Sequence, residues 1–322
     1  MKKIAIVFST FFIIISCSNG KNKLILKSST GRINSVLVVI KNSYWVDEVG
    51  KTLKDIFKSP VAGLSQPEAQ FSVTHIKPNL FGDLFNNSRN ILIVGIEAKA
   101  RYRVIKNKYA SPQIIMTITG KNESDLINKI KLHKQDILDI FKKGDLALYQ
   151  QKLSKKDWPT NKFLASTNFT IDVPKDYRLV ENRKDFLWVR KHLRGDNMIN
   201  ILIYKLPFNK QSSLTKAYII KKRDSIGKAQ IPGQFKDTYM QTSSAINPFL
   251  KKITVNGITA FVTKGLWNVK KDFMGGPFVN YTYTDIQHHQ YICLDGFVYA
   301  PNKNKRDYIF ELEAIFRTLK LK

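Results

Sequence analysis

The hydrophobic residues in the first half of the chain form short continuous runs separated by stretches of helical periodicity. The runs at 32–40, 71–76 and 90–96 have the length of strands. After the first run, Ser43 is the expected N-cap of a helix and Pro60 its expected end. The apolar stripe of this helix consists of Val46, Val49, Leu53, Ile56 and Phe57. With a short helix or turn before the third run, this order predicts a β-α-β-α-β sheet-and-helix domain.

Two more strands are expected in this half, at 103–105 and 113–119. Asn122 then stands at the expected N-cap of a long helix. The apolar stripe of that helix consists of Leu126, Ile130, Ile137, Leu138 and Phe141. The lysine-rich segment 150–160 interrupts the hydrophobic pattern. We interpret it as a linker between two domains.

The second half has mainly the pattern of strands. Apolar runs or alternations occur at 169–173, 186–188, 199–203, 258–267, 278–285 and 291–299. A helix is expected at 212–225, and a final helix after Asn304, with Asp307 in a capping-box arrangement. The predicted fold class is therefore α/β in the first half, and α+β in the second, with a mostly antiparallel sheet flanked by helices.

The chain begins with a basic start, Met1-Lys2-Lys3, and a 12-residue apolar stretch at 4–15. A membrane-spanning helix needs about 20 apolar residues, so this stretch is typical of a secretory signal peptide. Its end, Ile14-Ile15-Ser16-Cys17, resembles a bacterial lipobox. The resemblance implies cleavage after Ser16, and acylation of Cys17 with diacylglycerol and a further acyl chain such as palmitate. The alternative is an ordinary signal peptide with an incidental cysteine.

These patterns divide the chain into four segments. The segment after Cys17 is small, polar and basic, as in a flexible tether. The expected organisation is a lipoprotein signal peptide at 1–16, a lipidated flexible tether at 17–30, an N-terminal α/β domain at 31–150 and a C-terminal α+β domain at 160–322.

Composition narrows the class of protein. An apolar content of 43% with 11% aromatic residues excludes a disordered chain, and two cysteines in 322 residues exclude a disulfide scaffold. The 53 Lys+Arg against 25 Asp+Glu give a formal net charge of +28. The excess is spread over both halves, whereas nucleic-acid binders concentrate it on one face or arm. We expect no nucleic-acid partner, and we expect attraction to anionic lipid, to which each nearby Lys or Arg contributes about 1 kcal/mol.

Five short motifs carry a family resemblance. They are Gly31-Arg32-Ile33-Asn34, Gly265-Leu266-Trp267, the segment 272–278 (DFMGGPF), the segment 296–301 (GFVYAP) and the segment 311–315 (ELEAI). Together they resemble the Bacteroidota lipoprotein family catalogued as domain of unknown function 4837, over nearly all of the chain after the signal peptide. This family supplies no catalytic residues to carry over. The order of elements in the second half is also similar to the PsbP-like α-β-α sandwich.

The resemblance also bears on location. Surface-exposed lipoproteins of this phylum tend to carry acidic residues just after the lipidated cysteine. Residues 18–23 (SNGKNK) contain none. The comparison implies a lipid-anchored protein that faces the periplasm, on the cell membrane or the outer membrane.

No metal site or cofactor is expected from the sequence. His288 and His289 lie near Asp285 and Asp295, but adjacent residues of a strand point to opposite faces, so we favour a solvated hairpin tip. The sequence contains no G-x-S-x-G, H-E-x-x-H, P-loop or G-x-G-x-x-G motif. Cys293 is interpreted as a packed small hydrophobic residue, not as a reactive thiolate.

The segment 264–283 is the candidate ligand site, because aromatic residues and lysines surround a predicted Gly-Gly-Pro turn. Aromatic rings beside cations suit an anionic or glycan ligand. The candidate binding residues are Lys264, Trp267, Lys270, Asp272, Gly275, Gly276 and Tyr281. The alternative, which we favour, is a strand–turn–strand whose aromatic residues fill the core.

The sequence therefore predicts a non-catalytic binding or assembly module of the cell envelope, facing the periplasm. Its expected partners are the membrane through Cys17 and an anionic lipid, a glycan or an envelope protein. The alternative is an envelope hydrolase acting on a glycan or lipid with Asp272 or Asp295 near the Gly-Gly-Pro segment.

Overall fold

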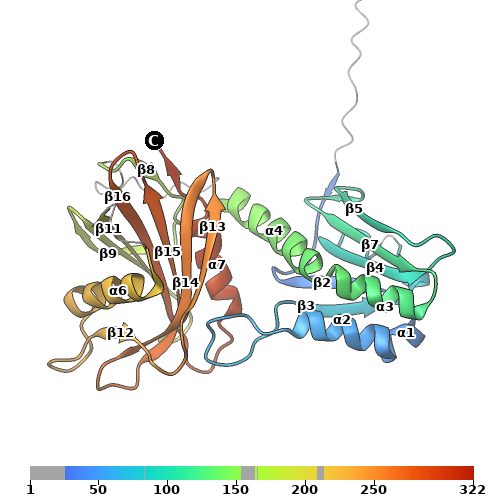
Figure 1. The fold of residues 1–322 in the computed structure, drawn as a ribbon, viewed down its shortest axis with the longest axis horizontal. Helices are drawn as coiled ribbons and strands as arrows, with labels where there is room; N and C mark the ends of the chain where they lie inside the picture. Colours follow the sequence, from blue (N-terminus) through green and yellow to red (C-terminus); the bar gives the residue numbers. More distant parts are fainter. Residues whose placement is uncertain (1–25, 83, 154–163, 165, 209–213) are drawn as a thin grey trace, which may run out of the picture.

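The computed structural model describes residues 26–82, 84–153, 164, 166–208 and 214–322. They form two large sheets, each with its own helices, and two small two-stranded pairs. The long helix α4 (Lys134–Leu153) runs from the first large sheet toward the second (Figure 1). The predicted signal peptide, Cys17 and most of the predicted tether lie outside the described residues, as does most of the segment 150–160.

The N-terminal sheet has five strands in the order β3-β2-β4-β7-β5. The first four strands are parallel to one another, and β5 pairs antiparallel with β7 at the edge. Their bounds are β2 Ser35–Val39, β3 Ser72–Ile76, β4 Asn90–Ile96, β5 Tyr102–Lys106 and β7 Ile114–Gly120. The predicted sheet-and-helix class is confirmed. The edge strand β5 is the one strand of this five-stranded sheet that runs antiparallel to its neighbour.

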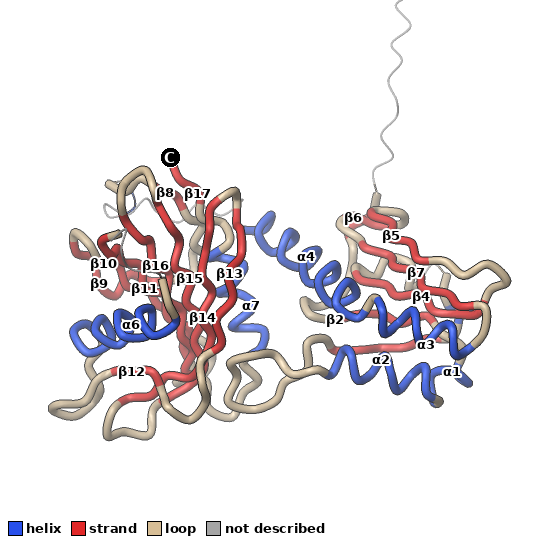
Figure 2. Tube along the Cα trace, in the orientation of Figure 1, coloured by secondary structure: helices blue, strands red, loops and turns tan. Residues whose placement is uncertain are grey.

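Helices cover one face of this sheet (Figure 2). They are α1 Asn42–Val46, α2 Glu48–Lys58, α3 Glu123–Leu132 and α4. Val38, Leu92 and Met116 of the strands pack against Leu53 and Phe141 of the helices, and all five side chains are buried. The opposite face carries a smaller core under the loop that contains the 3-10 helix η1 (Pro78–Leu80).

The predicted single helix after Ser43 is wrong. The chain forms α1 and then α2, and the side chain of Asp47 accepts the hydrogen bond that caps α2. Val46 is 70% exposed, although its spacing placed it in the apolar stripe. The backbone explains the break, because a Cβ on Gly50 would lie 1.9 Å from the carbonyl oxygen of Trp45. At this point the end of α1 lies against the first turn of α2. A side chain larger than that of glycine at position 50 would collide with the backbone of Trp45.

The predicted cap at Asn122 is confirmed, since its side chain accepts a hydrogen bond from the N–H of Asp125 at 2.9 Å. The helix that follows is interrupted at His133 into α3 and α4. α4 continues to Leu153, so the start of the segment interpreted as a linker is helical. Its length lets α4 contact β7 in the first half of the chain and the final helix in the second half.

The C-terminal sheet is antiparallel, in the order β12-β14-β15-β16-β11-β10-β9, with β13 also paired to β14. The strand bounds are β9 Arg178–Arg183, β10 Phe186–His192, β11 Met198–Pro207, β12 Met240–Thr242, β13 Phe249–Val255, β14 Ile258–Val269, β15 Gly275–Asp285 and β16 Gln290–Tyr299. A small pair joins β8 (Phe169–Thr170) to β17 (Lys320–Leu321).

Among the described residues of this half, one helix packs on each face of the sheet. α7 (Arg306–Phe316) packs on the face that bears Tyr281 and Tyr283, and α6 (Lys216–Gln230) lies on the face that bears Phe278. Successive residues of a strand point to opposite faces, so the two cores are built from alternate positions of the same strands. The α+β class expected for the second half is therefore confirmed.

The predicted cap of the final helix at Asn304 is wrong. The N-cap position is Lys305, which makes no side-chain cap. Instead, Glu68 from the first half of the chain accepts hydrogen bonds from the N–H groups of Lys305 at 2.7 Å and Arg306 at 2.9 Å. A carboxylate at a helix N-terminus is favoured by the unpaired N–H groups and by the helix dipole.

The two halves also meet along α4 and α7. Leu146 of α4 packs against Phe310 and Ala314 of α7. The side-chain amide of Asn34 donates a hydrogen bond to Asp307 at 2.8 Å. The backbone N–H of Asn34 donates to Asp145 at 2.7 Å. Apolar packing and buried hydrogen bonds thus fix α4 to both halves. No described helix has the length and apolar character that would let it cross a bilayer.

Candidate functional site

The structure does not gather the candidate residues of segment 264–283 into one site. Lys264 and Tyr281 point to the α7 face of the sheet, whereas Trp267 points to the α6 face. Lys270 and Asp272 lie in the turn between β14 and β15. The segment is a hairpin whose side chains serve two different cores.

Lys264 belongs to a buried charge network. Its Nζ atom lies 2.9 Å from Oε1 of Glu313, and the Nζ of Lys142 lies 3.4 Å from Oε2 of the same carboxylate. The Tyr281 hydroxyl donates to Glu313 at 3.4 Å and accepts from Arg317 at 3.0 Å. Every charge in the network has a partner, so its role is to hold α7 against the sheet and α4.

Gly275-Gly276-Pro277 is not the turn that the sequence predicted. These residues begin β15 and pair with Leu266, Trp267 and Asn268. A Cβ on Gly276 would lie 2.1 Å from the carbonyl oxygen of Val298, which also accepts a hydrogen bond from Trp267 Nε1 at 3.2 Å. Because Gly276 has no side chain, the indole of Trp267 and the backbone of Val298 can pack directly against it.

Asp272 and Asp295, the residues of the hydrolase alternative, are not brought together. Asp272 lies in the hairpin turn, where its carboxylate accepts from the N–H of Phe273. Asp295 lies within β16, is fully buried, and accepts from Arg223 at 2.8 Å and from Asn280 at 3.0 Å. Lys270 contacts the hydroxyl of Tyr239 at 3.2 Å. This arrangement provides no pair of accessible carboxylates.

In the part of the chain that the structure describes, the histidines and Cys293 belong to no group of His, Cys, Asp and Glu side chains that could hold a metal ion. The Nδ1 of His288 lies 3.0 Å from both oxygens of Asp285, which also accepts from Gln290 at 2.8 Å. Cys293 is 1% exposed in the α6-side core, and burial raises the pKa of its thiol to about 12. A thiol with that pKa is protonated and unreactive at neutral pH.

A pocket in the N-terminal half was not anticipated from the sequence. It lies between α4 and the edge of the sheet formed by β5 and β7, and its volume is about 520 Å³. This is within the range of roughly 300–1,000 Å³ for small-molecule sites. The lining residues are Arg89, Val104, Lys106, Asn107, Pro112, Gln113, Ile114, Ile140, Lys143, Gly144 and Ala147. We call it the α4 pocket.

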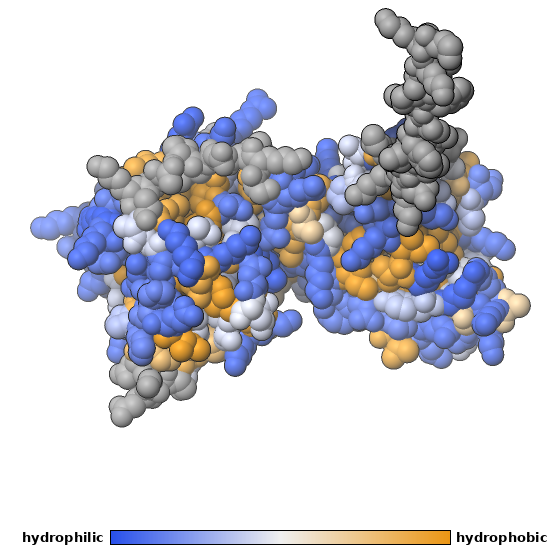
Figure 3. Space-filling view, turned by 90° about the horizontal axis from the view of Figure 1, so that it is seen from above, coloured by the Kyte–Doolittle hydropathy of each residue, from blue (hydrophilic) through white to orange (hydrophobic). Residues whose placement is uncertain are grey.

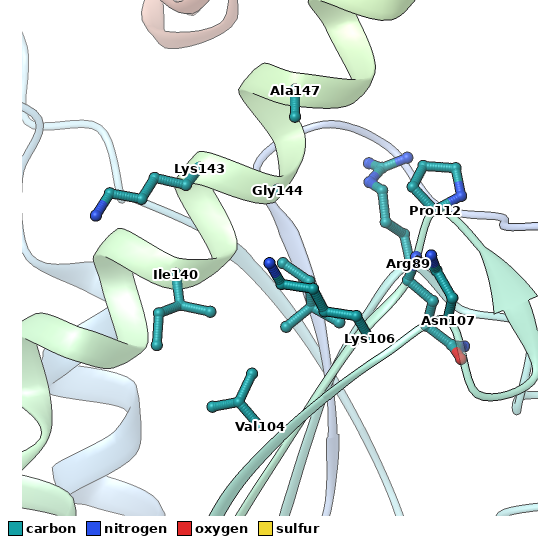
Figure 4. Close-up of a pocket in the computed structure, with 11 residues that line it drawn as sticks. Arg89, Val104, Lys106, Asn107, Pro112, Ile140, Lys143, Gly144 and Ala147 are labelled. Atoms are coloured by element: carbon teal, nitrogen blue, oxygen red, sulfur yellow. Dashed lines mark hydrogen bonds between the residues drawn. The ribbon is translucent and has the colours of Figure 1, made fainter.

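The apolar walls of the α4 pocket come from facing elements. In Figure 4, Val104 of β5 and Ile140 of α4 point toward each other, and Ala147 lies two turns further along the helix. A Cβ on Gly144 would lie 2.3 Å from Cδ1 of Ile114, so α4 touches β7 at this glycine. The pocket occupies the space beside that contact, toward the edge strand β5.

The charged groups of the α4 pocket are all cationic, and Asn107 and Gln113 add neutral polar groups. In Figure 4, Arg89 lies at the Pro112 end of the pocket. Its Nε donates to the fully buried Asp145 at 2.7 Å. Lys106 and Lys143 are exposed, and neither has an acidic partner among the described residues. No acidic side chain lines the pocket. The site therefore combines aliphatic walls with two uncompensated positive charges.

Asp145 supports the pocket from behind. Burial raises the pKa of Asp145, while the charge and hydrogen bond of Arg89 and the hydrogen bonds of Asn34 and Asn90 oppose the rise. The remaining guanidinium nitrogens of Arg89 donate to the carbonyl oxygens of Gly31 and Arg32. This arrangement holds the segment before β2 against the floor of the pocket.

The one sequence signal for the pocket is the spacing of Ile140, Gly144 and Ala147, which places an apolar residue and two small residues on one face of α4. That spacing does not identify the strand opposite. Val104 and Lys106 reach the site only because β5 returns antiparallel beside β7.

Comparison with solved structures finds partial matches at low identity. Mog1p, a Ran-binding protein of Saccharomyces cerevisiae, has 12% identity and a TM-score of 0.33 over 48% of this chain and 90% of its own. LpqN of Mycobacterium tuberculosis, described as involved in cell envelope biogenesis, has 15% identity and a TM-score of 0.30 over 48% of this chain and 83% of its own. A protein of Bacteroides thetaiotaomicron has 11% identity and a TM-score of 0.27 over 48% and 45%.

No curated protein sequence matches the chain significantly. Residues 29–154 match the family described as Domain of unknown function (DUF8532). The resemblance inferred from the motifs therefore extends over less of the chain than expected, because Gly31-Arg32-Ile33-Asn34 falls in this first match. The other four motifs all lie within residues 156–318, and over those residues the chain belongs to the family described as Domain of unknown function (DUF4837).

Proposed function

We propose that this protein is a cell-envelope lipoprotein that binds an anionic amphiphile, without catalysis, in the α4 pocket. The observation that supports the proposal is the pairing of mostly apolar walls with Lys106 and Lys143, which lack acidic partners among the described residues. An aliphatic tail fits between Val104 and Ile140, and an acidic head fits the two lysines at the mouth.

The magnitudes favour an amphiphile over a glycan. Each buried methylene group of a ligand contributes about 0.8 kcal/mol, so a tail of several carbons supplies most of the affinity. Glycan sites present aromatic platforms, and no aromatic side chain lines the α4 pocket. The lysines add specificity for an anion, because the pocket has no carboxylate to repel it.

The binding experiment uses the chain from residue 18 onward, which keeps every described residue, with dodecyl phosphate as the probe. Ala147 is exposed on α4 and lines the pocket, so Ala147→Trp fills the site with little effect on the core. Gln135→Trp is the matched control, because Gln135 is exposed on the same helix and does not line the pocket. Titration calorimetry is expected to show about tenfold or greater loss of affinity for Ala147→Trp alone.

A second arm tests the head group. Lys106→Gln and Lys143→Gln are each expected to weaken dodecyl phosphate binding about fivefold and to leave dodecanol binding unchanged. Lys134→Gln, at an exposed position of α4 outside the pocket, is the control. Equal affinity of wild type and Ala147→Trp for the probe, or no binding by either, would contradict the proposal.

The lipoprotein part of the proposal rests on the sequence Ile14-Ile15-Ser16-Cys17. Cleavage before Cys17 and its acylation would hold the protein on a membrane of the envelope, facing the periplasm. Two acyl chains anchor a protein stably, whereas one does so only marginally. Cys17→Ser is expected to give an unprocessed or soluble protein, detected by gel mobility and by loss of labelled palmitate. Unchanged processing and fractionation would refute the anchor.

A further inference from the structure

The described chain begins beside the α4 pocket. β1 (Lys27–Ser28) pairs in parallel with β6 (Ala110–Ser111), and the next residue, Pro112, lines the pocket. The backbone of Thr30 continues this contact, since its N–H donates to Asn87 and its carbonyl accepts from Arg89. The N-terminal end of the described chain is therefore fixed at one end of the pocket.

The same edge of the N-terminal sheet is cationic. β5 is the outer strand, and the segment 101–108 (RYRVIKNK) carries four basic residues and no acidic residue. Arg101 pairs with Glu97, but no described acidic group pairs with Arg103, Lys106 or Lys108, all of which are exposed. In Figure 1 the first described residues, in blue, lie near β5. Figure 3 views the molecule from above, where hydrophilic residues frame an apolar area.

We infer that this edge, defined by Lys27, Arg103, Lys106 and Lys108, docks on an anionic phospholipid bilayer and presents the α4 pocket to its headgroup layer. The inference deepens the proposed function, because it makes the membrane the source of the amphiphile. Nine residues, 18–26, separate Cys17 from Lys27. A chain of that length spans at most about 35 Å, so a lipid on Cys17 would keep this edge close to the bilayer.

An anionic bilayer fits this edge better than an acidic protein does. The cations lie along an edge strand and the neighbouring β1, which is an extended arrangement, and the chain end that carries the expected anchor leaves at the same place. Each cation near an anionic surface is expected to change binding about fivefold. The interaction should weaken as salt rises, because the charges are exposed.

The experiment measures co-sedimentation of the unlipidated chain from residue 18 with vesicles of phosphatidylcholine, with and without phosphatidylglycerol. The test variant is Lys27→Gln/Arg103→Gln/Lys108→Gln, which leaves the pocket residue Lys106 in place. The control is Lys221→Gln/Lys236→Gln/Lys251→Gln, which removes the same charge from exposed positions of the other half. The test variant is expected to lose about 100-fold in binding to the anionic vesicles, and the control much less.

The outcomes separate this inference from the proposed function. Binding of wild type to pure phosphatidylcholine at equal strength, or an equal loss in both triple variants, would overturn membrane docking by this edge. Ala147→Trp should still bind anionic vesicles, although it should not take up dodecyl phosphate. If the test variant keeps vesicle binding while Ala147→Trp loses the amphiphile, the docking inference fails and the pocket proposal stands. Circular dichroism of each variant checks that the fold is retained.

Discussion

The Nζ atom of Lys264 lies 2.9 Å from the Oε1 atom of Glu313, and both residues are buried, at 8% and 4% exposure. The pair links β14 to α7, and Lys142 brings α4 of the first half into the same network. Burial raises the pKa of Glu313, but the charges of Lys142 and Lys264 outweigh it and hold the pKa well below its ordinary value. The carboxylate is therefore charged and bound from both halves.

Replacing Glu313 by Gln is expected to lower the free energy of unfolding by about 3–5 kcal/mol, because Lys264 would remain buried without a counter-charge. Urea unfolding at neutral pH measures the change. In the double variant Lys264→Met/Glu313→Gln the loss should be smaller than the sum of the two single losses. Additive losses would contradict direct coupling of the two side chains.

The same carboxylate predicts a pH dependence. The folded pKa of Glu313 lies below its ordinary value of 4.5, so its stabilising contribution is complete above that pH and is lost as the pH falls toward the folded pKa. We expect the free energy of unfolding of the wild type to fall more steeply below pH 4.5 than that of Glu313→Gln. Parallel acid profiles for the two proteins would show that Glu313 does not carry this dependence.

The cap that Glu68 supplies to α7 can be tested locally. Glu68→Ala removes the acceptor for the N–H groups of Lys305 and Arg306, so those amides should exchange faster with deuterium. The expected loss of stability is about 1 kcal/mol. Glu123→Ala is a useful comparison, because Glu123 is a half-buried acidic residue in the first turn of α3 and its loss should leave α7 unaffected. Unchanged exchange at α7 would contradict the cap.

Cys293 provides a probe of the core. Its buried thiol has a pKa of about 12, so it should resist Ellman's reagent at pH 8 and react fully in denaturant. In the chain from residue 18 this is the sole thiol, which makes the count unambiguous. Rapid reaction of the native protein would place Cys293 at an accessible site and overturn its assignment to the core.

Gly276 tests whether the Gly-Gly-Pro segment is packed or free. A Cβ at this position would overlap the carbonyl oxygen of Val298, so Gly276→Ala should destabilise the protein by about 1–3 kcal/mol. Gly95→Ala is the control, because no atom lies within 4 Å of a Cβ built there. Equal melting temperatures for wild type and Gly276→Ala would restore a free loop as the better description.

The sequence by itself determined the fold class, the positions of most strands, the cap at Asn122 and the membership of the second half in its family. Strand periodicity and side-chain capping are local properties of the sequence. For this reason the strand at 278–285 and the helix N-cap at Asn122 could be predicted from short segments. The candidate ligand segment was not decided at this level. Its residues alternate along two strands, and alternation alone does not say what covers each face.

Tertiary structure decided the rest. Glu68 caps a helix more than 200 residues away, because it accepts hydrogen bonds from the N–H groups of Lys305 and Arg306. No local sequence motif predicts a capping residue so distant in the chain. Likewise, the α4 pocket depends on an antiparallel edge strand that brings Val104 opposite Ile140. Contacts between distant segments follow from sheet order and helix packing. These properties are set by the burial of the whole chain, and a short window of sequence does not contain them.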